Sequence, residues 1–189
     1  MNTFYPWLEK SWAQLMRGRD RLPHALLMTG TPGIGKRRFA EHLAQYLLCE
    51  SPDKLADPCG VCEGCRWFLS GNHPDFRLLA PDEQCEAESD DSKSKRKSPL
   101  IKVEAVRELT DFVNLTAHRY GAKVVLLDPA EAMNMAAANA FLKMLEEPPA
   151  GVTFILVSHH WRRLLPTIRS RCRIFPVPAP DVRLAGKWL

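Results

Sequence analysis

Short apolar runs alternate with helical periodicities along the chain. The apolar run Ala25–Thr29 ends at a glycine-rich loop, and Phe39, Leu43, Leu47 and Leu48 then recur at helical spacing. Strands that alternate with helices predict an α/β domain whose parallel sheet is covered by helices on both faces. Further strands are expected at Phe76–Leu79, 124–127, 152–157 and 173–177, with helices over 103–115 and Met135–Glu146.

Two segments interrupt this pattern. Residues 82–99 hold six acids followed by four bases and have no apolar periodicity, so we expect a mobile insertion, with a docking peptide as the alternative. Pro176, Pro178 and Pro180 predict an extended linker after the last strand. The expected organisation is one domain over 1–175, followed by a linker and the start of a second domain over 176–189.

Positive charge is concentrated near the C-terminus. The net charge of the 189 residues is +4, yet the stretch 159–189 holds seven Lys or Arg against one acid, Asp181. This asymmetry indicates an anionic partner, a phosphate or a nucleic acid, unless the stretch is simply a solvated surface. The sequence has no run of about 18 apolar residues and no basic segment followed by an apolar one, so a cytosolic protein is expected.

Four of the six cysteines have the spacing of a metal site. Cys59, Cys62 and Cys65 form C-x-x-C-x-x-C, and Cys49 at the end of the preceding helix supplies a fourth thiolate. Four thiolates with no open position predict a closed, structural zinc site, with Gly60 and Gly64 allowing tight turns between ligands. An iron–sulfur cluster or ordinary buried thiols are the alternatives. Cys85 and Cys172 are assigned to no metal.

The glycine-rich loop is a phosphate-binding motif that is broken at its last position. Residues 30–37 match G-x-x-x-x-G-K-[ST] through Gly30, Gly35 and Lys36, with Gly33 inside the loop, but Arg37 replaces the final hydroxyl. Backbone amides and the lysine hold the phosphates in such a loop, while the hydroxyl ligates Mg²⁺. The pattern therefore predicts a phosphate cradle that lacks a metal ligand, and it decides neither for nor against ATP binding.

Asp128 ends the apolar strand at 124–127, where nucleoside triphosphatases place a metal-binding aspartate. The next residue, usually a glutamate that polarises the attacking water, is Pro129, which accepts no proton. Glu131 lies two positions further along and is not assumed to replace it. The alternative is that Asp128 only caps the strand.

A long set of motifs resembles the clamp-loader branch of the AAA+ ATPases. The matching segments are Asn-Ala-Phe-Leu-Lys-Met-Leu-Glu-Glu-Pro-Pro at 139–149, Thr-Phe-Ile-Leu-Val-Ser at 153–158 and Ser170-Arg171-Cys172. Together with the four cysteines, the Gly-Asn-His-Pro-Asp run at 71–75 and the degraded nucleotide motifs, they resemble the delta prime subunits of bacterial DNA polymerase III. The resemblance runs from about 5 to 177 and implies a P-loop AAA+ domain with an inserted zinc module at 49–65. It also implies that 176–189 begins a lid domain.

The resemblance implies specific roles for individual residues. Ser170, Arg171 and Cys172 match a motif whose arginine reaches the ATP site of a neighbouring subunit. A guanidinium that stabilises charge on the transferring phosphoryl group is worth about 10³ to 10⁵ in rate. The alternative is a structural ion pair. This chain differs from familiar delta prime subunits in keeping Gly35 and Lys36, so nucleotide binding is less firmly excluded.

Three functions are compatible with these observations. The resemblance implies a non-hydrolysing subunit of a hetero-oligomeric clamp loader, with delta and gamma or tau as partners, which helps to load the sliding clamp onto primed DNA within the DNA polymerase III holoenzyme. An active motor ATPase of the same machine is the second, but Arg37 and Pro129 count against it. A zinc-dependent nucleic-acid-binding module is the third, but Lys54 and Arg66 provide little positive charge around the cysteines.

Overall fold

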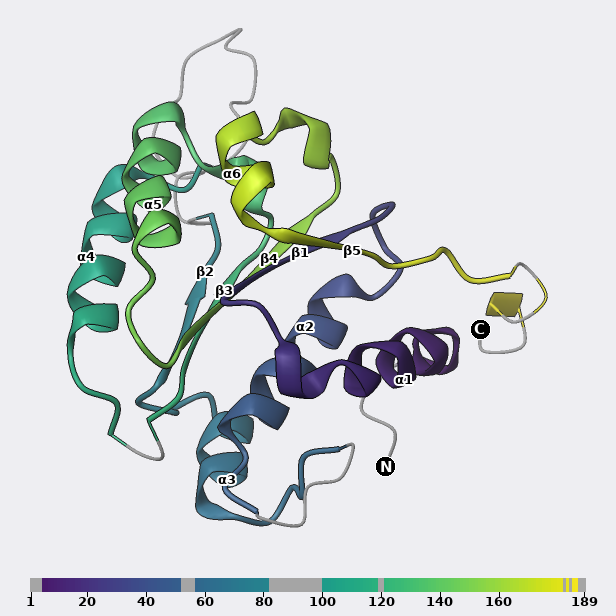
Figure 1. The fold of residues 1–189 in the computed structure, drawn as a ribbon. Helices are drawn as coiled ribbons and strands as arrows, with labels where there is room; N and C mark the ends of the chain where they lie inside the picture. Colours follow the sequence, from purple (N-terminus) through teal and green to yellow (C-terminus); the bar gives the residue numbers. More distant parts are fainter. Residues whose placement is uncertain are drawn as a thin grey trace, which may run out of the picture.

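A parallel sheet forms the centre of the structure. The computed structural model describes residues 5–51, 57–81, 100–118, 121–181, 183 and 185–186. Within these residues, five strands pair in the order β2-β3-β4-β1-β5, and each pairing is parallel (Figure 1). The strands are β1 (Ala25–Thr29), β2 (Phe76–Leu79), β3 (Lys123–Leu127), β4 (Val152–Ser158) and β5 (Arg173–Pro176).

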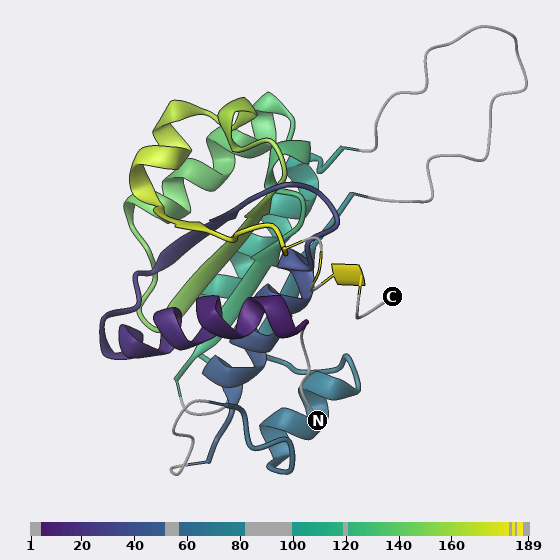
Figure 2. The same cartoon turned by 90° about the vertical axis from the view of Figure 1, so that its right-hand side faces the viewer.

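Helices cover both faces of this sheet. Helices α4 and α5 lie against one face, and α1 and α2 lie against the other, so the domain has three layers (Figures 1 and 2). Helix α3 follows α2 at the lower end of the view in Figure 1. The helices are α1 (Glu9–Arg17), α2 (Lys36–Leu48), α3 (Glu63–Leu69), α4 (Val103–Asn114), α5 (Met135–Glu146) and α6 (Pro166–Arg171), and short 3₁₀ turns cover Pro6–Leu8, Arg19–Arg21, Ala130–Ala132 and Trp161–Arg163.

The strand sequences explain this layered arrangement. Every residue of β1 and of β3 is buried, as expected for strands with helices on both sides. Successive side chains point to opposite faces, so Leu27 packs in the core under α4 and α5 while Leu26 and Met28 pack under α1 and α2. Burial of each such side chain stabilises the fold by about 1.5–3 kcal/mol.

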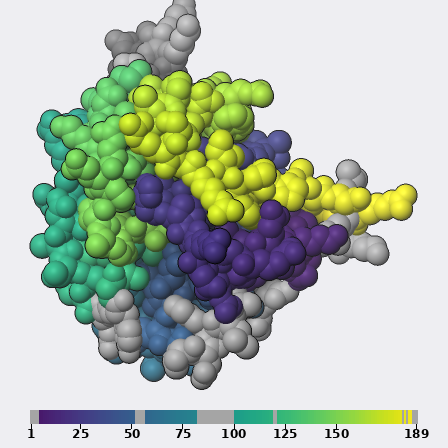
Figure 3. Space-filling model, in the orientation of Figure 1, coloured from purple at the N-terminus to yellow at the C-terminus, as the bar shows by residue number. Residues whose placement is uncertain are grey.

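The edge strand β5 packs against α2 and leads the chain to the end of β1. Phe175 stacks on Phe39 of α2 with ring centroids 5.9 Å apart, and the Val177 amide donates to the Thr29 carbonyl at 2.8 Å. Figure 3 shows the yellow C-terminal segment crossing the surface beside the purple α1. This contact brings the chain after β5 against the loop that follows β1.

The predicted fold class is confirmed, and most strand and helix positions agree within one residue. Sequence analysis predicts neither α1 nor α3 as a helix. Gly60 is in a left-handed turn with φ +73°, as expected, but the turn expected at Gly64 is wrong. Gly64 lies inside α3, where a Cβ atom would come within 2.6 Å of the Leu48 carbonyl. The expected mobile insertion at 82–99 lies outside the described residues, as do Cys85 and Lys54.

The described helices include none that is both long enough and apolar enough to span a bilayer.

Lys123 is a buried cation that joins β3 to the end of α4. Its ammonium donates to the carbonyls of Phe112 and Leu115 and lies 4.7 Å from the Phe112 ring centroid. Burial lowers the pKa of Lys123, while the fully buried Asp75 acts in the opposite direction. Lys123→Met is expected to lower the free energy of unfolding by about 3 kcal/mol, because it leaves buried carbonyls unpaired and a buried carboxylate with less compensation.

Urea unfolding of the purified chain measures this effect. Lys143→Met is the matched control, since Lys143 is exposed on α5 and its substitution should change the free energy of unfolding by less than about 0.5 kcal/mol. Equal effects of the two substitutions would contradict a stabilising role for Lys123.

Candidate functional site

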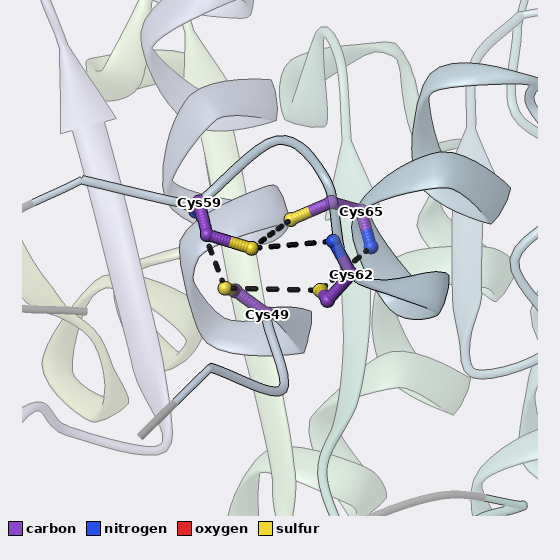
Figure 4. Close-up of side chains that lie close together, drawn as sticks. All are labelled: Cys49, Cys59, Cys62 and Cys65. Carbon is purple, nitrogen blue, oxygen red and sulfur yellow. Dashed lines mark hydrogen bonds between the residues drawn. The ribbon is translucent and has the colours of Figure 1, made fainter. Parts of the chain in front are cut away.

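The four predicted metal ligands come together in one cluster. The sulfur atoms of Cys49, Cys59, Cys62 and Cys65 all lie within 4.8 Å of one another (Figure 4). Cys49 follows the last residue of α2, Cys62 caps the N-terminus of α3, and Cys65 lies in its first turn. The cluster therefore joins the end of one helix to the start of the next through the loop that carries Cys59.

Backbone amides donate to three of the four sulfur atoms. The amide of Cys62 donates to Cys59 Sγ at 3.3 Å, and the amide of Cys65 donates to Cys62 Sγ at 3.3 Å. The amide of Cys59 donates to Cys49 Sγ at 3.4 Å. Amides of Val61 and Cys62 lower the pKa of the Cys59 thiol to about 6, whereas burial raises the pKa of Cys65. A cation among the sulfurs would compensate the charge of the buried thiolates.

The geometry fits a tetrahedral metal ion. Zinc–sulfur bonds of about 2.3 Å place the sulfurs of a tetrahedral site about 3.8 Å apart. The Cys59–Cys65 and Cys49–Cys62 sulfur pairs are each 4.0 Å apart. Four cysteines could thus hold one ion, and no ligand position is left open for catalysis.

The glycine-rich loop connects β1 to α2, as its motif predicts. Gly35 has φ +90° at the N-cap of α2, and a Cβ atom there would lie 2.4 Å from the Tyr5 ring. Lys36 is the first residue of the helix and only 2% exposed. Its Nζ donates to the carbonyls of Gly30 at 2.8 Å and Thr31 at 2.6 Å, so the ammonium is held by the loop's own backbone. Burial lowers the pKa of Lys36, against the effect of Asp128.

Aromatic residues from the N-terminal segment pack against this loop. Trp7 Nε1 donates to the carbonyl of Ile34 at 2.9 Å, and the Trp7 ring stacks on Tyr5 with centroids 4.6 Å apart. From another direction, a Cβ atom on Gly30 would lie 2.6 Å from the Val177 carbonyl. The loop is therefore enclosed by segments from both ends of the described chain.

Asp128, Pro129 and Glu131 follow β3, at the positions that sequence analysis considered for metal binding and water activation. Asp128 follows β3 and is 7% exposed, and Pro129 follows it. Glu131 Oε1 accepts the amides of His159 at 2.8 Å and His160 at 2.9 Å. These hydrogen bonds help to lower the pKa of Glu131, although its burial acts the other way. One carboxylate oxygen of Glu131 thus holds the start of the chain that follows β4.

Arg171, the predicted trans-acting residue, lies at the end of α6. Its side chain is 36% exposed and forms a 2.7 Å ion pair with Glu146 at the end of α5. Its Nη1 also donates to the Thr167 carbonyl at 3.1 Å. Ser170 Oγ donates to the same carbonyl, and Cys172 is a buried free thiol. In the isolated chain, Arg171 therefore has the ion pair that sequence analysis raised as the alternative, but at the surface.

Sequence analysis did not predict several contacts at these sites. The contacts of Trp7 with the loop and of Glu146 with Arg171 join positions far apart along the chain. The same is true of Arg37 and Asp128, whose Nη1 and Oδ2 atoms lie 3.8 Å apart. Glu146 and Arg171 both lie in segments quoted for the resemblance, but the motifs do not say that they contact each other. The structure keeps the cysteine cluster, the glycine-rich loop and Arg171 as separate features of one domain.

The parallel sheet, the glycine-rich loop after β1 and the four-cysteine module define a P-loop α/β domain of the AAA+ class. Residues 8–181 match the family model described as DNA polymerase III, delta subunit, and the chain belongs to this family. Over 189 residues, the chain is 46% identical to the DNA polymerase III subunit delta' of Pseudomonas aeruginosa, covering 100% of this chain and 53% of that relative. It is 42% identical to the subunit of the same name from Escherichia coli, covering 98% and 52%.

A solved structure supports the same fold. A DNA polymerase III gamma subunit-related protein from Thermotoga maritima superposes with a TM-score of 0.64 and 25% identity, covering 90% of this chain and 47% of that chain. The chain described here spans about half the length of the curated relatives it matches.

Proposed function

We propose that this chain is the N-terminal part of a non-hydrolysing subunit of the DNA polymerase III clamp loader. In this role it helps the ATP-dependent loading of the sliding clamp onto primed DNA, in a hetero-oligomer with delta and gamma or tau subunits, and acts in the cytoplasm. The family match over residues 8–181 is the observation that carries the proposal.

The residues around the glycine-rich loop support the absence of hydrolysis. Arg37 replaces the hydroxyl that would ligate Mg²⁺, and Pro129 replaces the residue that would polarise water. Glu131 Oε1 accepts hydrogen bonds from two backbone amides, so the position of this side chain is tied to the backbone after β4. A phosphoryl transfer site needs a metal ion that neutralises charge and a residue that orients the attacking water. The usual metal-ligating hydroxyl and water-orienting residue are both replaced in this chain.

The position of Arg171 supports a role at a neighbouring ATP site. Its guanidinium is partly exposed at the end of α6, and its partner Glu146 is itself 49% exposed. An exposed ion pair contributes only about 0.2–1 kcal/mol, so exchanging Glu146 for a phosphate group costs little. We propose that Arg171 makes this exchange on assembly and stabilises the charge on the γ-phosphate of the adjacent subunit.

The purified chain is expected to hydrolyse no ATP above background, because the metal-ligating hydroxyl and the water-polarising residue are both replaced. Steady-state phosphate release measures this, and Arg37→Thr or Pro129→Glu alone should not create activity, since each restores only one missing part. Turnover near the ~1 s⁻¹ lower end of common enzyme rates would instead favour the motor ATPase.

We further propose that the cysteine cluster binds structural zinc. Cys49, Cys59, Cys62 and Cys65 would hold the ion, and zinc supplies a closed tetrahedral crosslink without redox chemistry. Within the described part of the module, residues 49–51 and 57–65, few apolar side chains are buried, and α3 buries only Gly64 and Cys65. Its folding therefore depends on the metal more than on a core of its own.

A further inference from the structure

Arg37 faces the carboxylate that would otherwise bind a metal. It follows the buried Lys36 at the start of α2. Its Nε donates to Glu41 Oε1 one helical turn later at 3.0 Å, and its Nη1 lies 3.8 Å from Asp128 Oδ2. The side chain thus spans from the helix surface to the end of β3, with half of its area exposed.

Asp128 needs a positive partner at this place. A carboxylate that is 93% removed from solvent is costly unless a counter-charge or hydrogen bonds compensate it. Among the described residues, its Oδ1 has no hydrogen-bond partner. Burial raises the pKa of Asp128, and Arg37 is the strongest influence that lowers it. His159 and then Lys36 lower the pKa of Asp128 less, and the Lys36 ammonium donates to the loop carbonyls.

These residues do not fit Mg²⁺. In a P-loop site the metal is held by the Ser or Thr hydroxyl of the motif and by the aspartate at the end of the strand. Mg²⁺ requires oxygen ligands in near-ideal octahedral geometry. A guanidinium offers five N–H donors and no acceptor, and its charge beside Asp128 repels a second cation.

We propose that Arg37 takes the place of the metal ion, with its guanidinium as the permanent counter-charge of Asp128. The loop then neither requires nor accepts Mg²⁺, and a polyphosphate that it binds is bound as the metal-free anion. This inference deepens the proposed non-hydrolysing role and rests on it, but it concerns an equilibrium property of this chain and not turnover.

A double-mutant cycle on the zinc-loaded chain tests the pairing of Arg37 with Asp128. The unfolding equilibria of Arg37→Thr, Asp128→Asn and the double variant are compared in buffer free of divalent cations. We expect a coupling of about fivefold or more in the unfolding equilibrium constant. Arg38→Thr is the matched control, because Arg38 lies over the Tyr5 ring at 5.3 Å and should show no coupling with Asp128. Asp128→Ser replaces the asparagine variant if that variant does not fold.

Electron paramagnetic resonance of Mn²⁺ tests the exclusion of the metal. Wild-type chain is titrated with Mn²⁺ alone and with Mn²⁺ plus pyrophosphate, and Asp128→Asn is titrated in parallel. We expect no bound Mn²⁺ that depends on Asp128. Either such Mn²⁺ in the wild-type chain or a cycle without coupling would overturn the inference. A chain that fails in this way yet hydrolyses no ATP would leave the proposed role intact, so the two failures are distinguishable.

Discussion

Arg171→Ala is expected to slow hydrolysis at the neighbouring ATP site by about 10³-fold or more in a reconstituted clamp loader. The variant chain should still fold and enter the complex, since Arg171 is partly exposed and its ion pair lies at the surface. The substitution should lower kcat for ATP hydrolysis by the adjacent subunit, because a guanidinium finger acts mainly on transition-state charge. Single-turnover ATP hydrolysis with primed DNA measures it, together with clamp loading.

Two further variants separate catalysis from structure. Arg169→Ala removes a neighbouring arginine of α6 that lies over the Trp161 ring at 5.2 Å, and it should leave the fast phase of hydrolysis intact. Glu146→Gln removes the ion-pair partner of Arg171 and should also preserve hydrolysis, since the arginine is then free to reach the phosphate. If Arg171→Ala matches the wild-type complex, the arginine has only a structural role.

We expect the purified chain to bind one zinc ion through its four clustered cysteines. Structural zinc binding contributes apparent free energies of about 10–16 kcal/mol in small zinc domains, so Cys65→Ser should unfold the module around α3. Metal analysis of the purified chain gives the stoichiometry, and amide hydrogen exchange locates the loss of structure. The expected loss of protection covers α3 and the loop carrying Cys59, while the central sheet keeps its protection.

Cys172→Ser is the matched control for the zinc prediction. Cys172 is a buried free thiol that follows α6 and takes no part in the cluster. Its substitution should leave one zinc ion bound. Iron with visible absorption would show that the cysteines hold an iron–sulfur cluster and not zinc. Four reactive thiols without metal would show that the cysteines form no metal site.

The sheet was predictable because its strands are short and almost wholly apolar. Each residue of β3 is buried, so its apolar run stands out in the sequence. Helix α1 was not predicted but could have been, because Leu8, Trp12, Leu15 and Met16 recur at helical spacing. Helix α3 could not be predicted in this way. Its seven residues bury only Gly64 and Cys65, so they show no apolar periodicity, and the helix begins directly after Cys62.

The features of the candidate site also differ in how far the sequence predicts them. The four cysteines and the glycine-rich loop are motifs of near neighbours, and local spacing identifies them. The contact of Arg37 with Asp128 joins residues from α2 and the end of β3, which only the strand order brings together. The hydrogen bonds that the amides of His159 and His160 donate to Glu131 also join residues that only the tertiary fold brings together. Such contacts depend on tertiary packing that no local pattern specifies.

The most direct test of the central claim is a structure of the assembled clamp loader with a non-hydrolysable ATP analogue. The account predicts that the Arg171 guanidinium has left Glu146 and lies within hydrogen-bond distance of the γ-phosphate bound to the adjacent subunit. An Arg171 that stays paired with Glu146 and away from every nucleotide in the complex would contradict it.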